Sequence, residues 1–184
     1  MPRLFTALEI PAPVGQSLGM MRGGLPGARW IDPENYHLTL RFIGDIDDAL
    51  AREIAGMLGR VQRRSFELCL DGLSAFGGRK PRALVAAATQ VAPLMELQAE
   101  HERLLQRLGL EPDGRKFTPH VTLARLRDSS SQQVADYLAA RGYFRSAPFQ
   151  VSRFVLFSSR ASVGGGPYVV EADYPLEERV LRRA

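Results

Sequence analysis

The amino-acid sequence predicts an α+β fold in which two similar halves form a bilobal molecule. Segments of alternating apolar and polar residues, typical of strands, are interspersed with segments whose apolar residues recur every three or four positions, typical of helices. One strand pattern occurs twice, as His37-Leu38-Thr39-Leu40 and, 83 residues later, as His120-Val121-Thr122-Leu123. With 184 residues the chain can bury one substantial core. We therefore expect a single domain spanning residues 1–184, with an internal repeat at roughly 36–89 and 119–174.

The first half is expected to contain four strands and two helices. The strands are placed at residues 3–10, 36–43, 66–73 and 83–89, and the helices at about 16–22 and 47–61. Pro11 closes the first strand and Gly44 the second, because both residue types interrupt regular structure. Asp47 or Asp48 can cap the second helix, whose apolar stripe would face the core.

The second half is expected to follow the same order after one further helix. Pro93 opens that helix, Gly109 stops it, and its apolar stripe includes His101. Because such a stripe faces the core, we interpret His101 as a packing residue. The remaining strands are placed at residues 117–126, 149–158 and 168–174, with a helix capped within 129–131 and ending near 141.

Two connectors are rich in glycine, as phosphate-binding loops are. Residues 74–82 place glycines beside basic residues, but they lack the Gly-Lys-Ser/Thr ending of a P-loop and precede a strand. Residues 163–167 contain three consecutive glycines with no helix after them. We interpret the first segment as a surface hairpin loop and the second as a flexible hairpin connector.

The composition is that of an ordinary soluble globular protein, with 45% apolar and 24% charged residues. The single cysteine, Cys69, lies in a strand pattern and cannot form an intramolecular disulfide, which fits a reducing compartment. The sequence has no apolar run long enough for a membrane span or a secretory signal, so a cytoplasmic location is expected. The net charge of +4 comes mainly from arginine, which permits an anionic or nucleic-acid ligand but is explained equally well by codon bias.

The segments that follow the two histidine motifs are related by the same 83-residue spacing as the motifs themselves. Shifting the chain by 83 residues places Phe66 on Phe149 and Leu73 on Leu156, and the strands that follow also coincide. A duplicated unit is the economical explanation. Two copies of one unit normally pack about a pseudo-twofold axis, which places equivalent strands opposite one another. We therefore expect both motif histidines to share one central groove.

Each motif combines an imidazole and a hydroxyl on one face of a strand, because side chains alternate between the two faces. Imidazole gains and loses a proton near neutral pH, so His37 and His120 can supply the acid and the base that hydrolysis of a cyclic phosphate requires. Thr39 and Thr122 can donate hydrogen bonds to phosphate oxygens, and an arginine can neutralise developing charge. No metal or other cofactor is needed, and the usual metal-ligand spacings are missing from the sequence. The two motifs leave open which histidine is the acid.

Four segments resemble the two-histidine (2H) phosphoesterase superfamily and, within it, the family of RNA 2′,3′-cyclic phosphodiesterases, also called 2′-5′ RNA ligases. These segments are residues 3–11, 35–44, 117–125 and 154–159, and the middle two contain the signature His-x-Thr motifs. The resemblance implies antiparallel sheets lining the groove, with helices outside. It implies hydrolysis of RNA 2′,3′-cyclic phosphate ends to 2′-phosphates, together with reversible 2′-5′ ligation. It also implies that His37 is the proton donor and His120 the proton acceptor.

The resemblance also selects Arg125, which closes the second motif, as the phosphate-binding arginine. Strict alternation from His120 places Arg125 on the opposite face, so this role requires a bulge or a twist near the end of the strand. Arg41 has the matching parity from His37 and is the second candidate. Four aromatic residues can stack on a base or belong to the core: Phe5, Trp30, Tyr36 and Phe42.

Other functions remain open at this stage. The same chemistry suits a phosphodiesterase acting on small cyclic nucleotides or on a cyclic phosphate of an ADP-ribose-like compound. A non-catalytic RNA-binding module would keep the groove but would not need two proton-transfer groups. The expected partner is RNA or a nucleotide ending in a 2′,3′-cyclic phosphate, without a membrane, and the protein is expected to be a monomer.

Overall fold

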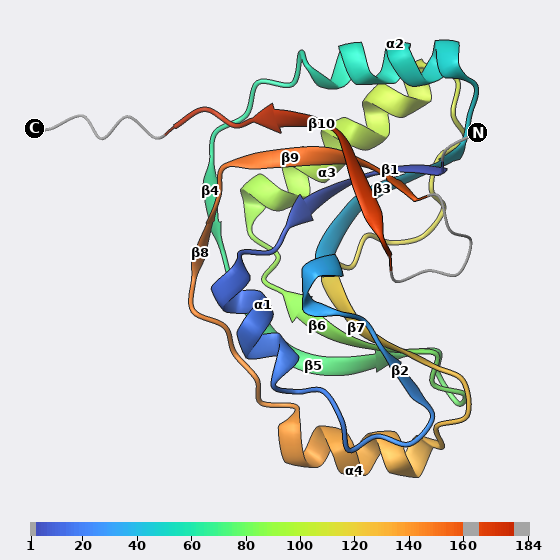
Figure 1. Cartoon of the computed structure of the whole chain (residues 1–184). Helices are drawn as coiled ribbons and strands as arrows, with labels where there is room; N and C mark the ends of the chain where they lie inside the picture. Colours follow the sequence, from blue (N-terminus) through green and yellow to red (C-terminus); the bar gives the residue numbers. More distant parts are fainter. Residues whose placement is uncertain (1–2, 160–165, 179–184) are drawn as a thin grey trace, which may run out of the picture.

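The computed structural model describes residues 3–159 and 166–178, which form two antiparallel sheets with helices outside them (Figure 1). The strands are β1 (Arg3–Glu9), β2 (Ala28–Trp30), β3 (His37–Asp45), β4 (Phe66–Leu68), β5 (Leu70–Phe76), β6 (Ala83–Ala88), β7 (His120–Leu126), β8 (Phe149–Val151), β9 (Arg153–Ser159) and β10 (Tyr168–Pro175). The helices are α1 (Ala12–Gly19), α2 (Asp48–Leu58), α3 (Ala92–Arg107) and α4 (Ser131–Arg141), with a 3₁₀ turn η1 (Pro33–Asn35). The expected α+β class with antiparallel sheets is confirmed.

The larger sheet has the strand order β10-β9-β1-β3-β7-β6-β5, with β2 also paired to β7. Its two middle strands are joined through one residue pair, Leu38 with Val121, whereas β1 and β3 pair along most of their length. We call β10, β9, β1 and β3 the His37 sheet, and β7, β6, β5 and β2 the His120 sheet. In Figure 1, α2 and α3 lie at the end of the molecule near β9 and β10, and α4 lies at the opposite end beyond β5.

The His37 sheet and the His120 sheet, which are the two parts of the larger sheet, each have one face toward the core and a second face that carries a motif histidine. The main core includes Leu8, Leu38 and Phe154, which point toward α3 and its neighbours. A separate small cluster on the second face of the His37 sheet contains Phe5 and Phe157. Two chemically different faces on one sheet follow from the alternation of side chains along each strand.

The helix boundaries reflect local capping. Asp47 caps α2 by accepting a hydrogen bond from the Leu50 amide at 2.8 Å, and Ser130 forms a capping box with Gln133 at the start of α4, as expected. The short helix expected at 16–22 is present, but its bounds are wrong, because α1 begins at Ala12 and ends at Gly19. The proline that follows Ala12 lies in the first turn, where the missing amide hydrogen has no intrahelical acceptor to lose.

Two expected strands are each divided in the structure. The segment 66–73 is split at Cys69 into β4 and β5, and the segment 149–158 is split at Ser152 into β8 and β9. β4 pairs with β8, β5 continues beside β6, and β9 continues beside β1. Each break therefore passes the chain from the small sheet into the larger one. Cys69 is buried at its break with Sγ 3.3 Å from the Ser146 carbonyl, so its role is structural.

His101 is fully buried on α3, which confirms its interpretation as a packing residue. Its Nδ1 lies 2.9 Å from the Thr6 hydroxyl on β1, and its ring lies 4.5 Å from that of Phe154. Burial lowers the pKa of His101 to about 3, so the ring is neutral under ordinary conditions.

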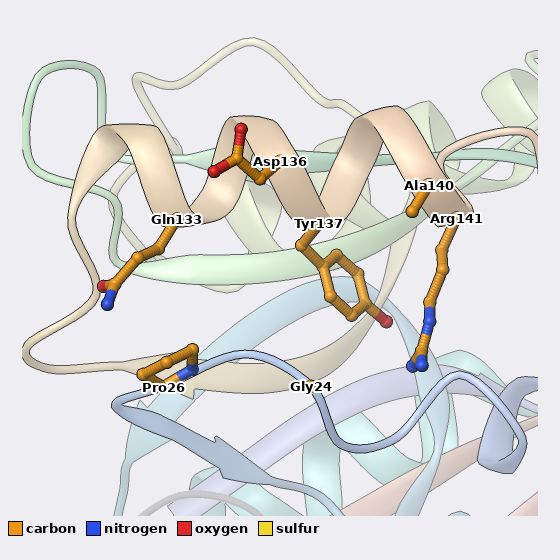
Figure 2. A pocket seen from close by; sticks show the side chains of 7 residues that line it. All are labelled: Gly24, Pro26, Gln133, Asp136, Tyr137, Ala140 and Arg141. Carbon is orange, nitrogen blue, oxygen red and sulfur yellow. The ribbon is translucent and has the colours of Figure 1, made fainter.

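A short strand not expected from the sequence, β2, follows a loop that α4 holds in place. The Tyr137 hydroxyl donates to the Met21 carbonyl, and the Arg141 guanidinium donates to the carbonyls of Met21 and Gly23 at 3.1 and 3.0 Å. Figure 2 shows both side chains extending from α4 toward the loop at Gly24, around a hollow of about 360 Å³. These bonds fix the loop that delivers β2 to the edge of β7.

The connector at 74–82 forms the expected hairpin, with β5 continuing to Phe76 and pairing antiparallel with β6. Gly77 and Gly78 have φ values of 118° and 60°, a conformation that favours glycine. The connector at 163–167 falls largely outside the described residues. Among the described helices, none is both long and apolar enough to cross a membrane.

Candidate active site

The two His-x-Thr motifs lie side by side where β3 meets β7. Leu38 is paired antiparallel with Val121, so by the geometry of such a pair His37 is the neighbour of Thr122 across the strands and Thr39 is the neighbour of His120. Leu38 and Val121 are fully buried, whereas the two histidines and two threonines are half-buried on the other face. Diagonal neighbours on such a face have Cβ atoms about 7–8 Å apart in a regular pair, a separation that suits one phosphate group between two imidazoles.

Each motif histidine is held by the backbone carbonyl two residues before it. Nδ1 of His37 lies 2.9 Å from the Asn35 oxygen, and Nδ1 of His120 lies 2.6 Å from the Thr118 oxygen. A carbonyl oxygen only accepts, so Nδ1 carries the hydrogen in both rings and Nε2 is left for proton exchange. These two contacts could not be predicted from the sequence, because every residue type has a backbone carbonyl and the identity of residues 35 and 118 therefore does not indicate the bond.

Aromatic rings surround the two imidazoles. The His37 ring lies 5.1 Å from Phe5, 5.9 Å from Phe157 and 4.8 Å from Tyr168, measured between centroids. The His120 ring meets Phe76 edge to face at 4.7 Å. These rings restrict the rotation of the imidazoles and exclude water from one side of each.

Both motif histidines have pKa values below the ordinary 6.5 of the side chain. Burial is the main cause in each case, and the positive charge of Arg125 lowers both pKa values further. His120 also lowers the pKa of His37. His37, His120 and Arg125 therefore lie within electrostatic reach of one another.

A bulge in β7 brings Arg125 onto the histidine face. Pairing with β6 passes from Thr122 to Ala124, leaving Leu123 as an extra residue. Leu123 and Ala124 are consequently buried in succession, and Arg125 is exposed. This is the irregularity that Arg125 needs in order to share a face with His120.

A matching bulge in β3 removes Arg41 from the same face. Pairing with β1 skips Leu40, so Arg41 turns toward α3, where it is buried and paired with Glu102. It also donates to the Glu111 carbonyl at 2.6 Å. The second phosphate candidate is therefore wrong, because strict alternation from His37 does not hold through the bulge. Phe42 takes the place on the histidine face, with 47% of its surface exposed.

The aromatic candidates divide between the faces. Tyr36 is buried in the main core, and Trp30 packs beside Tyr137 at 6.0 Å. Phe5 and Phe42 lie near His37, with their rings 6.5 Å apart. Of the four aromatic candidates, the two on the histidine side thus come from β1 and β3.

The threonine hydroxyls of the two motifs make no hydrogen bond within residues 3–159 and 166–178. Over the same residues, no group of three or more His, Cys, Asp or Glu side chains is arranged to hold a metal ion. The donors on the shared face are therefore hydroxyls, imidazoles and a guanidinium, a set that suits an anionic phosphate.

Comparisons with known proteins also indicate a protein that acts on phosphate esters. Residues 8–86 and 85–168 each match the family model described as LigT like Phosphoesterase. A protein of Aeropyrum pernix named RNA 2′,3′-cyclic phosphodiesterase is 37% identical over 106 residues, covering 56% of this chain and 60% of that protein. A protein of the same name from Thermotoga maritima is 29% identical over 193 residues, covering 99% of this chain and 100% of its own length.

Solved structures agree with these sequence matches. The crystal structure of E. coli LigT complexed with 3′-AMP superposes with a TM-score of 0.76 at 25% identity, covering 96% of this chain and 99% of that one. The two matches to the family model together span most of the sequence, including both His-x-Thr motifs. The chain belongs to the LigT-like phosphoesterase family.

Proposed function

We propose that this protein hydrolyses the 2′,3′-cyclic phosphate at the end of an RNA chain to a 2′-phosphate. The observation that carries the proposal is the pair of imidazoles, each anchored through Nδ1, that share one face with two threonine hydroxyls and Arg125. The names of the relatives support this substrate, since those proteins are called RNA 2′,3′-cyclic phosphodiesterases.

In the proposed reaction, Thr39, Thr122 and Arg125 bind the non-bridging phosphate oxygens. Nε2 of His120 takes a proton from water, whose oxygen forms a new bond to phosphorus. The bond from phosphorus to the 3′-oxygen breaks, and Nε2–H of His37 donates a proton to that oxygen. The product carries a 2′-phosphate and a free 3′-hydroxyl, and no metal takes part.

The lowered pKa values of the two histidines affect which of them is protonated during the proposed reaction. Catalysis needs one imidazolium and one neutral imidazole, although both rings lose their protons more readily than an ordinary histidine. An anionic phosphate between them favours protonation of one ring. If a 5′-hydroxyl replaces water, the same steps form a 2′-5′ linkage, and in the reverse reaction the two histidines exchange roles.

The test is turnover of an oligonucleotide with a 2′,3′-cyclic phosphate end in the presence of a chelator. The products are separated into 2′- and 3′-phosphates, and His37→Ala and His120→Ala are measured beside the unmodified protein. We expect 2′-phosphate only, with a loss of at least about 100-fold in each variant. Activity that survives either substitution, or that depends on metal, would contradict the mechanism. RNA affinity without turnover would indicate a binding module instead.

A further inference from the structure

The turn that joins β5 to β6, residues 77–82, carries three basic side chains and no acidic one. Arg79, Lys80 and Arg82 are all exposed. Within residues 3–159 and 166–178, none of these side chains forms an ion pair or donates a hydrogen bond. We call residues 77–82 the basic turn. Its cationic groups take no part in the mechanism above and are available to a ligand.

The basic turn begins beside the candidate active site. The ring of Phe76, the residue before the turn, meets the His120 imidazole edge to face at 4.7 Å. Arg79 and Lys80 follow three and four residues later, so the Cα atoms of both lie within about 14 Å of the Phe76 Cα. A ligand several nucleotides long that is bound at His120 can therefore also contact the basic turn.

The backbone of the basic turn is held in one conformation. The Arg82 amide donates to the Phe76 carbonyl at 2.7 Å, and the Ser131 hydroxyl, at the start of α4, donates to the Arg79 carbonyl at 2.8 Å. A Cβ added at Gly77 would lie 2.7 Å from the Arg82 nitrogen, so the turn is too tight for a side chain there. Figure 1 shows the turn beside the connector from β7 to α4. Because this backbone is already fixed, a ligand does not bear the entropic cost of ordering it.

The end of β7 extends the basic surface. The Leu126 amide donates to the Arg82 carbonyl at 2.8 Å, which places the end of β7 beside the basic turn. Arg127, the next residue, is exposed and adds a fourth cation, and Asp128 after it is exposed and adds one carboxylate. Four basic side chains and one acidic side chain leave a net charge of +3 on this surface.

An RNA chain bound by its end can leave the candidate site on either side of β7, because β2 pairs with one edge of this strand and β6 with the other. On the β2 side, a pocket of about 320 Å³ beside Arg125 is formed by β2 and the segment before β3. Its lining includes two arginines, Arg29 and Arg125, and two acidic residues, Asp32 and Glu34, so its charges cancel. The β6 side leads to the basic turn, where the net positive charge attracts backbone phosphates.

We propose that the basic turn binds the sugar-phosphate backbone of the RNA that precedes the terminal cyclic phosphate. Arg79 and Lys80 contact phosphodiesters upstream of the terminal nucleotide, while the reacting phosphate stays with the groups assigned to it above. The inference rests on the proposed function and names its preferred substrate class, an RNA chain of several nucleotides rather than a nucleoside 2′,3′-cyclic monophosphate. Backbone contacts carry no direct sequence information, so we expect no preference among base sequences.

The test measures binding by calorimetry, which does not require turnover. An RNA oligonucleotide ending in a 2′-phosphate and a nucleoside 2′-monophosphate are each titrated over a range of salt concentrations. In the double variant Arg79→Gln/Lys80→Gln, we expect the affinity for the oligonucleotide to fall about tenfold at low salt. The slope of its logarithm against that of the salt concentration should become shallower by about 1.4, since each phosphate contact on a single strand contributes about 0.7. The affinity for the monophosphate should stay the same.

Arg103→Gln/Arg107→Gln is the matched control, because it removes the same two charges from exposed positions on α3. Its affinity and salt slope for the oligonucleotide should equal those of the unmodified protein.

Three results would overturn the binding surface: equal affinities of the unmodified protein for the two ligands, equal losses in the two double variants, or a parallel loss of monophosphate binding in Arg79→Gln/Lys80→Gln. A preference for the oligonucleotide that depends on Arg79 and Lys80, in a protein without turnover, would uphold the surface and refute the proposed function. Turnover by a protein that lacks this preference would do the reverse.

Discussion

Arg125 and Phe42 occupy equivalent positions in two strands that share the same irregularity. Each lies five residues after its motif histidine, beyond a bulge at Leu123 or Leu40. One strand therefore offers a guanidinium on the histidine face and the other an exposed phenyl ring. The difference between Arg125 and Phe42, together with the larger number of aromatic rings beside His37, makes the candidate site chemically asymmetric.

Replacing Arg125 should move the pH dependence of catalysis. Both motif histidines have pKa values lowered below 6.5, so the optimum of kcat/KM is expected below pH 6.5. Arg125 lowers both pKa values, so its removal in Arg125→Gln raises both and shifts both limbs of the profile to higher pH. We also expect kcat to fall by about 100-fold, because a donor to the transition state is lost.

Arg125→Lys is the control for this shift. It retains the charge and should keep the pH profile in place, while losing part of the rate because an ammonium lacks the fork of a guanidinium. A profile that is unchanged in Arg125→Gln would show that Arg125 does not act electrostatically on the histidines.

At the level of elements, the sequence indicated most helices and strands but not where strands change partners. The apolar alternation of residues 66–70 continues through Cys69, so nothing in that pattern marks the passage from one sheet to another. At the second break, Ser152 and Arg153 are two consecutive polar residues that interrupt the alternation, a signal that the strand expected at 149–158 did not take into account. β2 is only three residues long, and tertiary pairing with β7 creates it. Arg125 was placed on the correct face only on the condition of a bulge, because local propensity does not reveal the register of a partner strand.

The contact between α3 and β1 predicts a pH dependence of stability. His101 is neutral in the folded protein with a pKa of about 3, and an unfolded histidine has a pKa of 6.5. Between these values the unfolded state binds a proton that the folded state does not, so the free energy of unfolding falls as the pH falls. From pH 6.5 to 5 the free energy of unfolding falls by about 1.6 kcal/mol through this group.

Urea unfolding of the unmodified protein and His101→Gln across this interval checks the effect. Glutamine has no titrating group, so the variant should lose this part of the pH dependence even if it is less stable at pH 7. Parallel stability curves for the two proteins would show that His101 is not held neutral by burial.

At the scale of the whole molecule, the His37 sheet and the His120 sheet both contribute residues to the candidate site. His37 belongs to one sheet and His120 to the other, and they meet at the single pair that joins β3 to β7. The repeated motif predicted from the sequence that the two histidines would lie together. The pocket beside Arg125 was not predicted, because it is formed by β2 and the segment before β3, which come together only in the folded chain. The internal duplication itself stays a prediction.

Because one chain supplies both motifs, we expect a catalytically complete monomer. Sedimentation equilibrium should give a single species near 20.4 kDa at all concentrations, and activity per chain should not change on dilution. A dimeric mass accompanied by loss of activity on dilution would show that a second copy is needed.

The position of β1 has a consequence for biosynthesis. β1 precedes β3 and β9 along the chain, yet in the finished sheet it lies between them, with Arg3 beside Ser159. Its pairing with β3 can form early, but its other edge has no partner until β9, Arg153–Ser159, has left the ribosome. Pairing across such a sequence separation slows folding, and an unpaired apolar edge invites association with other chains. Newly made chains are therefore most exposed to aggregation, and most in need of a chaperone, during the interval before β9 emerges.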